Sequence, residues 1–301
     1  TRIKFKRKGN IFMEKNWFDE KLYENADEIG FKQSLLNTKT VATKKSEFQD
    51  IVIFDSSRFG RVLALDGVIQ TTTADEFFYH EMFTHVPIIA HGNVKSVLII
   101  GGGDGGILRE VLKHKSITRA VMVEIDGDVI DLCQKHMPTL NNGAFASPRA
   151  EIKVADGIEY VKTTAEKFDL IIVDSTDPMN VGEVLFTDEF YANAKKCLNS
   201  GGLLTTQSGV PFLQVHELKN IQNRLGKLFE YLTFYVVPVP TYIGGFMCLS
   251  FASDSNLKDL DLATIEQRFL QANIEDTKYY NPQIHLASFA LPQYIKKIIS
   301  Q

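Results

Sequence analysis

Cysteine is scarce in this sequence, with only three residues among 301. Cys133, Cys197 and Cys248 stand far apart, each in an apolar stretch. An odd number argues against a disulfide framework, and no cysteine or histidine spacing is typical of a metal site. We therefore expect three buried free thiols, no bound metal, and a reducing compartment such as the cytoplasm.

A long apolar run and an excess of basic charge are also missing. No apolar run approaches the roughly 18 residues that a membrane-spanning helix needs. Lys and Arg number 33 against 37 Asp and Glu, a net charge of −4, whereas a nucleic-acid-binding surface would be basic. We expect neither a membrane nor a nucleic-acid partner. With 44% apolar and 23% charged residues, the composition is typical of a globular protein with one large domain or two unequal ones.

The N-terminal part consists of a basic stretch followed by short β-rich runs. Residues 1–12, TRIKFKRKGNIF, lack the apolar core of a signal peptide. Because Met13 fits a natural start, we expect them to be an extension that need not be native. Residues 13–75 are expected to form a small antiparallel β-sheet domain, in which Asp66-Gly67 is a strong hairpin signal. The expected strands are Ile51–Phe54, Arg61–Leu65 and Val68–Thr72.

The pattern changes at Asp75, which we expect to cap a helix that extends to Ala90. Beyond it, apolar strands alternate with amphipathic helices, which predicts a Rossmann-like, doubly wound parallel sheet over residues 76–301. A turn is expected at Asn199–Gly202. The expected strands are Val97–Ile100, Ala120–Val123, Ile152–Val154, Leu170–Val173 and Leu203–Thr206, completed by Phe234–Val237 and Met247–Phe251.

An acidic residue stands at or just beyond the end of each of the first four strands. Asp104 lies in the turn after the first strand, and Glu124 ends the second. Asp156 and Asp174 follow the third and the fourth. In a doubly wound sheet, ligands bind beyond the carboxyl ends of the strands. The sequence therefore predicts a crevice lined with four carboxylates.

The stretch GGGDGG has G-x-G-x-x-G spacing at Gly101, Gly103 and Gly106, between a strand and a helix. Such a turn is typical of dinucleotide or nucleoside binding, and Glu124 stands where an acid would accept the ribose hydroxyls. Asp104 argues against a pyrophosphate, because like charges about 4 Å apart repel by several kcal/mol even at an effective dielectric of about 20. The turn therefore favours a ligand that brings a positive charge to Asp104.

The run FDLIIVDSTDP places Asp174 and Asp177 three residues apart, just beyond a buried strand. Paired carboxylates can bind a metal ion, but no histidine cluster accompanies this pair. They can also hold an amine while one of them accepts a proton. A solvated turn is the plain structural alternative, and the alignment of this pair with the other acids argues against it.

Seven segments together resemble the spermidine synthases, which are polyamine aminopropyltransferases. They are LALDGVIQTT, DEFFYHEMFTHVP, VLIIGGGDGG, VEID, ADGIEYV, IIVDSTDP and PTYIGGF, in register from about Trp17 to the C-terminus. The later stretch YYNPQIHLASFALPQY resembles the bacterial members. The resemblance implies a methyltransferase-type Rossmann-like fold. It also implies transfer of an aminopropyl group from decarboxylated S-adenosylmethionine, a co-substrate and not a prosthetic group, to putrescine, giving spermidine and methylthioadenosine.

The resemblance implies roles for individual residues as well. Asp174 would be the catalytic proton acceptor, and Asp104 would bind the amine of the aminopropyl group. The donor site would consist of Gln49, Gly101, Gly103, Asp104, Glu124, Asp156, Gly157 and Val181. The diamine site would consist of Tyr79, His80, Asp104, Asp177 and Tyr242.

Two stretches depart from the family pattern. Asn180-Val181 replaces the usual Gly-Pro, so that Val181 takes the place of a proline that packs on the adenine. Thr73-Ala74 replaces the usual Glu-Arg. The choice among diamines is therefore left open.

Two other classes of protein also stay open. An S-adenosylmethionine-dependent N-methyltransferase would share the sheet, but Asp104 would repel the carboxylate of its donor. A catalytically inactive nucleoside-binding or scaffold protein would not need Asp174 and Asp177. The N-terminal sheet presents edges that need cover, and the family assembles through such regions, so we expect a homo-oligomer, either a dimer or a tetramer.

Overall fold

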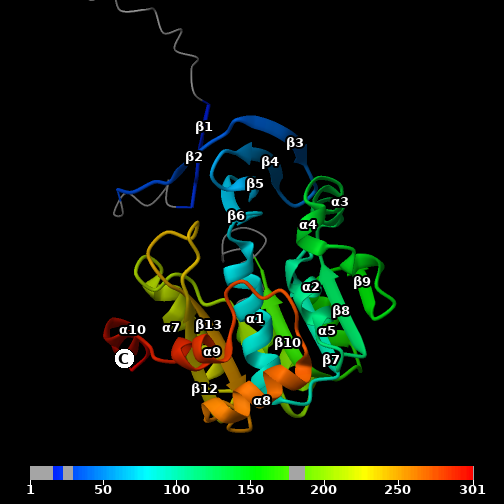
Figure 1. The fold of residues 1–301 in the computed structure, drawn as a ribbon, viewed down its shortest axis with the longest axis vertical. Helices are drawn as coiled ribbons and strands as arrows, with labels where there is room; N and C mark the ends of the chain where they lie inside the picture. Colours follow the sequence, from blue (N-terminus) through cyan, green and yellow to red (C-terminus); the bar gives the residue numbers. More distant parts are fainter. Residues whose placement is uncertain (1–15, 23–29, 176–186, 301) are drawn as a thin grey trace, which may run out of the picture.

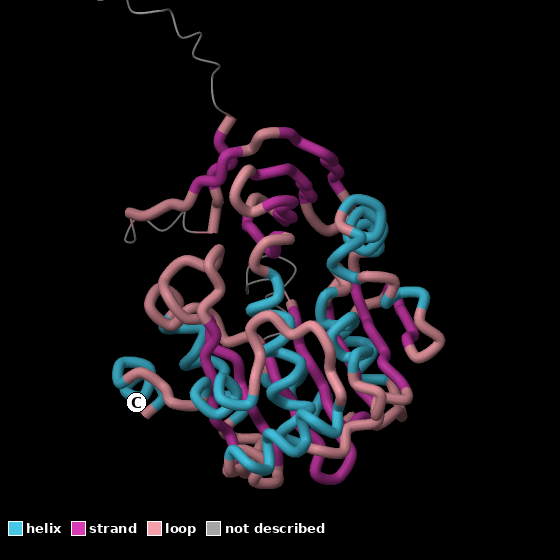
Figure 2. The backbone as a smooth tube through the Cα atoms, in the orientation of Figure 1, coloured by secondary structure: helices cyan, strands magenta, loops and turns pink. Residues whose placement is uncertain are grey.

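The computed structural model describes residues 16–22, 30–175 and 187–300. Figure 1 shows a central sheet with helices on both faces and a group of N-terminal strands above one end of it. The same arrangement is visible in Figure 2, where the N-terminal strands arch over that end. The expected extension, residues 1–12, lies outside the described residues.

The central sheet has seven strands among the described residues, in the order β12-β13-β11-β10-β7-β8-β9. The strands β7 to β11 pair in parallel. The chain runs outward from β7 to β9 and then, on the other side, from β10 to β11, so the strand order reverses between β7 and β10. The bounds are β7 (Ser96–Gly101), β8 (Arg119–Glu124), β9 (Ala150–Val154), β10 (Phe168–Asp174), β11 (Leu198–Thr206), β12 (Tyr231–Val237) and β13 (Met247–Ser253). The Rossmann-like architecture is thereby confirmed.

One strand, β13, is antiparallel to both of its neighbours. The expected parallel pairing therefore holds for β7 to β11, and β13 departs from it. Only residues 238–246 connect β12 to β13, which is too short for the crossover that parallel neighbours require. The apolar pattern of a buried strand is the same in either direction, so the length of the connection decides the pairing.

Helices cover both faces of this sheet, and each face has its own apolar cluster. Ile99 of β7 belongs to the cluster that contains Met82 and Phe83, whereas its neighbour Leu98 belongs to the cluster of Phe190. Burial on both faces explains why the strands are continuous apolar runs. The helices are α1 (Glu76–His91), α2 (Gly106–Lys113), α3 (Gly127–His136), α4 (Pro138–Asn141), α5 (Gly157–Thr163), α6 (Asp188–Lys196), α7 (Val215–Leu225), α8 (Leu262–Ala272), α9 (Pro282–Ser288) and α10 (Gln293–Ile299).

The N-terminal strands form a two-stranded and a four-stranded antiparallel sheet. In the larger sheet, Asp66 and Gly67 have φ angles of 50° and 83°, which is the tight hairpin that this pair predicts. Leu63 of this sheet shares an apolar cluster with Val129 of α3, and this packing holds the sheet over the carboxyl ends of the central strands. The strands are β1 (Trp17–Asp19), β2 (Ser34–Leu36), β3 (Lys39–Lys45), β4 (Asp50–Ser56), β5 (Gly60–Leu65) and β6 (Val68–Thr72).

Asp75 immediately precedes α1, but its side chain does not cap the helix. Its carboxylate instead accepts hydrogen bonds from the backbone N–H of Thr241 at 2.9 Å and from the hydroxyl of Thr241 at 2.7 Å. A third bond comes from the hydroxyl of Thr72 at 2.5 Å. The expected cap is wrong because this buried carboxylate binds donors of two other segments, which ties the loop at Thr241 to the start of α1.

The expected turn at Asn199–Gly202 is also wrong. These residues belong to β11, where the pairing with β10 shifts register: Phe168 lies opposite Leu198, and Leu170 lies opposite Leu203. The additional residues of β11 form a bulge. The glycine-rich stretch therefore interrupts the ladder without leaving the sheet.

The three cysteines, Cys133, Cys197 and Cys248, are buried and free. The expectation of free thiols is confirmed. None of the helices in the described ranges combines the length and the apolar character that crossing a bilayer requires.

Candidate active site

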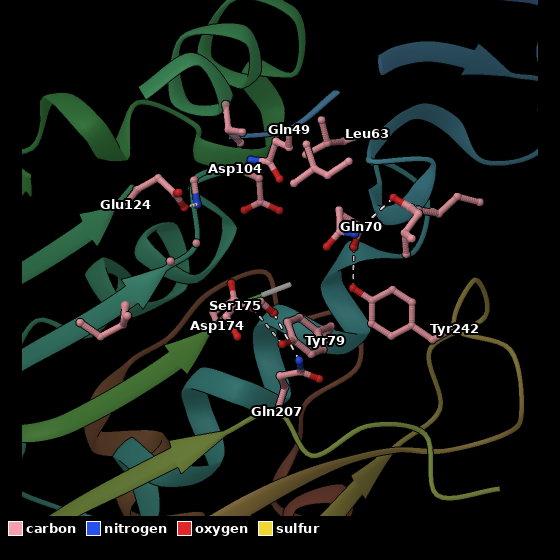
Figure 3. A pocket seen from close by; sticks show the side chains of 18 of the residues that line it. Gln49, Leu63, Gln70, Tyr79, Asp104, Glu124, Asp174, Ser175, Gln207 and Tyr242 are labelled. Carbon is pink, nitrogen blue, oxygen red and sulfur yellow. Dashed lines mark hydrogen bonds between the residues drawn. The ribbon is translucent and has the colours of Figure 1, made fainter. Parts of the chain in front are cut away.

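A pocket lies between the N-terminal sheet and the carboxyl ends of β7 and β10, where the strand order reverses (Figure 3). This is the edge at which the sequence predicts a crevice. The expected site residues that line it are Gln49, Tyr79, His80, Gly101, Gly103, Asp104, Glu124, Asp156, Gly157, Asp174 and Tyr242. The other two, Asp177 and Val181, fall within residues 176–186 and lie outside the described residues.

The glycine turn passes close to two neighbouring elements. Gly101 has a φ of 83°, and a Cβ there would lie 2.0 Å from the backbone oxygen of Asp174. A Cβ on Gly106 would lie 2.2 Å from the His80 ring. Glycine is therefore required on both sides of the turn, where the backbone contacts β10 and α1.

Asp104 is held inside this turn by two contacts. Its Oδ1 accepts a hydrogen bond from the backbone N–H of Gly106 at 2.7 Å, at the first residue of α2. Its Oδ2 lies 3.4 Å from Nε2 of His80. The carboxylate therefore has a defined orientation at the pocket wall.

Asp174 ends β10, directly opposite Gly101 of β7. Its Oδ1 accepts a hydrogen bond from the hydroxyl of Tyr79 at 2.8 Å. Burial, and then the charge of Asp104, raise the pKa of Asp174 to about 6, although His80 and Tyr79 act in the opposite direction. A carboxylate with this pKa is ionised at neutral pH and is a better proton acceptor than an exposed one.

Glu124 ends the neighbouring strand β8. It accepts hydrogen bonds from the backbone N–H groups of Gly103 at 3.1 Å and Asp126 at 2.9 Å. Burial raises its pKa to about 7 in spite of these bonds. In Figure 3 its side chain lies beside the glycine turn, at the wall of the pocket.

Two further acids at this edge cap helices. Asp156 accepts a hydrogen bond from the backbone N–H of Ile158 at 2.8 Å, at the start of α5. Asp126 caps α3, and its other oxygen accepts a hydrogen bond from Nε2 of Gln49 at 2.8 Å. Gln49 lies between β3 and β4, so this bond ties the N-terminal sheet to the carboxyl edge of the central sheet.

Tyr242 lines the pocket on the side away from Glu124. Its hydroxyl donates to the backbone oxygen of Gln70 at 2.5 Å, as Figure 3 shows. Its ring meets the Tyr79 ring edge-on, with centroids 5.7 Å apart. The two tyrosines therefore form an aromatic wall next to Asp174.

The pocket also contains residues that sequence reasoning missed, namely Glu20, Gln70 and Thr241. Glu20 is 7% exposed and accepts a hydrogen bond from the backbone N–H of Ile69 at 3.0 Å. It follows a short edge strand of the small sheet, where no periodicity or spacing signals a site. For Thr241 a signal was present, because it immediately precedes Tyr242 in the motif PTYIGGF.

The pocket therefore combines carboxylates, tyrosines and one buried histidine. In the part of the chain that the structure describes, no three His, Cys, Asp or Glu side chains are grouped so as to hold a metal ion. An excess of carboxylates attracts a cationic ligand. A buried carboxylate with a pKa of about 6 can also take a proton from that ligand.

Two segments of the chain match known families. Residues 76–262 match the spermine/spermidine synthase domain, and residues 17–73 match the spermidine synthase tetramerisation domain. Polyamine aminopropyltransferase 1 of Pseudomonas aeruginosa is 50% identical over 285 residues, which cover 94% of this chain and 98% of the relative. The polyamine aminopropyltransferase of Pseudomonas syringae pv. tomato is 48% identical over 285 residues, with the same coverage of 94% and 98%.

Two solved structures are similar to this chain over nearly its whole length. A spermidine synthase in complex with the transition state analogue AdoDATO has a TM-score of 0.88 and 40% identity, over 95% of each chain. The spermidine synthase from Thermotoga maritima has a TM-score of 0.85 and 38% identity, over 95% of this chain and 94% of that one.

Proposed function

Because the chain belongs to the spermine/spermidine synthase family, we propose that it is a polyamine aminopropyltransferase that makes spermidine. It transfers the aminopropyl group of decarboxylated S-adenosylmethionine to putrescine and releases methylthioadenosine. The observation that carries this proposal is the pair Asp104 and Asp174, which line one pocket at adjacent strand ends. Asp104 suits the cationic end of the donor, and Asp174 suits the attacking amine.

In the proposed reaction, Asp174 accepts the proton of the attacking amine. The nitrogen forms a bond to the carbon next to the sulfonium, and the carbon–sulfur bond breaks with its electron pair going to sulfur, which leaves a neutral thioether. An alkyl ammonium resembles Lys, with a pKa of about 10.4, so the amine must lose a proton before it attacks. The pKa of Asp174 is raised to about 6, which reduces the difference in pKa between the ammonium and this carboxyl group. The proton transfer is therefore less unfavourable.

The proposed donor contacts are those that the resemblance to the spermidine synthases implies. Glu124 accepts the ribose hydroxyls, and Asp156 with Gly157 holds the adenine end. Asp104 binds the ammonium of the aminopropyl group. Val181 in the donor site also belongs to the proposal, although it lies outside the described residues.

The proposed acceptor contacts lie on the opposite side. Tyr79 and Tyr242 form the wall of the proposed diamine channel. Asp177 also belongs to the proposed acceptor site, although it lies outside the described residues. Glu20 adds a carboxylate to the same pocket, which suits a ligand with two cationic ends. A diamine is such a ligand.

Direct assay of the purified protein tests the function. Incubation with decarboxylated S-adenosylmethionine and putrescine is expected to give spermidine and methylthioadenosine by mass spectrometry. Cadaverine and longer amines, assayed in parallel, define the acceptor preference. Methylation of an amine with S-adenosylmethionine, and no aminopropyl transfer, would instead identify an N-methyltransferase.

We further propose that the protein is a homo-oligomer, either a dimer or a tetramer, and that residues 13–75 form a domain distinct from residues 76–301. The match of residues 17–73 to a tetramerisation domain supports assembly. Light scattering coupled to size-exclusion chromatography distinguishes the two states. The buried free cysteines support the proposal of a reducing compartment such as the cytoplasm.

A further inference from the structure

A chain of buried charged groups leads from the interior to the carboxylate of Asp104. Oε2 of Glu76 accepts hydrogen bonds from Nδ1 of His80 at 2.6 Å and from an Nη of Arg109 at 2.8 Å. On the other side of the ring, Nε2 of His80 lies 3.4 Å from Oδ2 of Asp104. Glu76 is 9% exposed and His80 is 2% exposed, so water screens these contacts little.

Arg109 has few alternative positions. Its Nε donates to Oε1 of Glu110 at 2.7 Å, and Nη1 donates to the backbone oxygen of Leu140 at 2.7 Å. The guanidinium thereby joins α1, α2 and α4 at one point. A planar group held on several sides provides a rigid support for Glu76.

The two ring nitrogens of His80 face two carboxylates. Burial by itself would lower the pKa of His80, but Asp104 and Glu76 outweigh it and raise the pKa to about 10. The ring is therefore an imidazolium at neutral pH, with Nδ1 hydrogen-bonded to Glu76 and Nε2 3.4 Å from Oδ2 of Asp104. A cationic ring between two carboxylates is poorly suited to binding a cationic amine.

The glycine turn provides an independent observation. A Cβ at Gly106 would lie 2.2 Å from Cε1 and 2.3 Å from Nδ1 of His80. The first residue of α2 is therefore in direct contact with the ring. The same residue donates its backbone N–H to Asp104, so Gly106 contacts both members of the His80–Asp104 pair.

We propose that Glu76, supported by Arg109, is a positioning residue that acts through His80 to orient Asp104 toward the ammonium of the donor. His80 then serves the donor side of the reaction, and not the diamine. This inference rests on the proposed aminopropyl transfer. It predicts that replacing Glu76 or His80 changes the affinity for ligands that contact Asp104 and leaves the affinity for other ligands unchanged.

Decarboxylated S-adenosylmethionine and methylthioadenosine provide the required comparison, because only the former carries the amine that would meet Asp104. In the Glu76→Gln variant, calorimetry is expected to show a donor Kd raised about tenfold, with the Kd of methylthioadenosine changed less than about twofold. The KM for putrescine is expected to stay near its wild-type value. Glu81→Gln is the matched control: Glu81 is buried on the same helix, and it binds the backbone N–H groups of Lys278, Tyr279 and Tyr280. It is expected to lower Tm and leave both Kd values unchanged.

A double-mutant cycle with His80→Gln tests whether Glu76 acts through the ring. If it does, Glu76→Gln has little further effect on donor affinity when His80 is already replaced. Additive effects of the two substitutions overturn the inference, and so does an equal change in both Kd values or an effect confined to the KM for putrescine. If Glu76→Gln does not fold, His80→Gln alone must show the same difference between the two ligands. Wild-type protein that fails to bind the donor would instead contradict the proposed function.

Discussion

The hydroxyl of Tyr79 lies 2.8 Å from Oδ1 of Asp174, although the two residues are 95 positions apart in the sequence. Tyr79 is in the first turns of α1, and Asp174 is the last residue of β10. The bond joins the helix to the strand end at which the proposed proton transfer takes place. It orients the carboxylate and stabilises its charged form.

The first prediction concerns the base. Asp174→Asn keeps the size of the side chain and removes its ability to accept a proton from the amine. We expect kcat to fall about 10²–10⁴-fold and the donor Kd to change little, because donor contacts lie on other residues. Steady-state kinetics and calorimetry measure the two quantities. A variant with near-normal kcat would remove Asp174 from the role of proton acceptor.

The second prediction concerns pH. The ionised form of Asp174 is the base, so kcat/KM should fall as the pH drops through the pKa of about 6. Tyr79→Phe removes a hydrogen bond that lowers this pKa, so the acidic limb of the profile should move to higher pH. A pH–rate profile of each protein measures the shift.

Tyr235→Phe is the control for this profile. Tyr235 is also a buried tyrosine, but its hydroxyl donates to the backbone oxygen of Met82 at 3.3 Å and not to Asp174. The acidic limb of the pH–rate profile of Tyr235→Phe should coincide with that of the wild type. An unchanged limb in Tyr79→Phe would show that another group controls the low-pH side.

The third prediction concerns the choice of donor. The carboxylate of Asp104 should attract a terminal ammonium and repel the additional carboxylate of S-adenosylmethionine. Asp104→Asn is therefore expected to lower the affinity for decarboxylated S-adenosylmethionine by about 10²-fold, a change of about 2.7 kcal/mol. The ratio of this affinity to the affinity for S-adenosylmethionine should become smaller. Titration of both donors into both proteins measures this ratio. A ratio that survives the substitution would contradict the electrostatic explanation.

The fourth prediction concerns the glycine turn. Gly101 and Gly143 have nearly equal φ angles of 83° and 81°, but a Cβ at Gly143 would meet nothing within 4 Å. Gly143→Ala should therefore cost only the left-handed backbone strain, about 1–2 kcal/mol. Gly101→Ala adds a collision with the backbone oxygen of Asp174 and should cost about 3 kcal/mol or more. Urea unfolding of the two variants measures the difference, and equal losses would mean that the turn has room to move.

Much of the fold follows from local patterns. Continuous apolar strands that alternate with amphipathic helices predict a doubly wound sheet, since only burial on both faces calls for such strands. The pair Asp66-Gly67 predicts its hairpin because both residues adopt positive φ readily. The direction of β13 does not follow from its apolar composition, and the short connection from β12, residues 238–246, decides it instead.

The sequence by itself determined that Asp104, Glu124 and Asp174 lie along one pocket. Each follows a strand of a parallel sheet, and the carboxyl ends of such strands meet at one edge. Only the tertiary structure decided which groups these acids contact and that the pKa values of Glu124 and Asp174 are raised. The bond of Tyr79 to Asp174, and that of Arg109 to Glu76, join segments distant in sequence, and the raised pKa of Asp174 depends on burial that many segments create together. Long-range contacts and desolvation are properties of the folded chain, and no local spacing of residues encodes them.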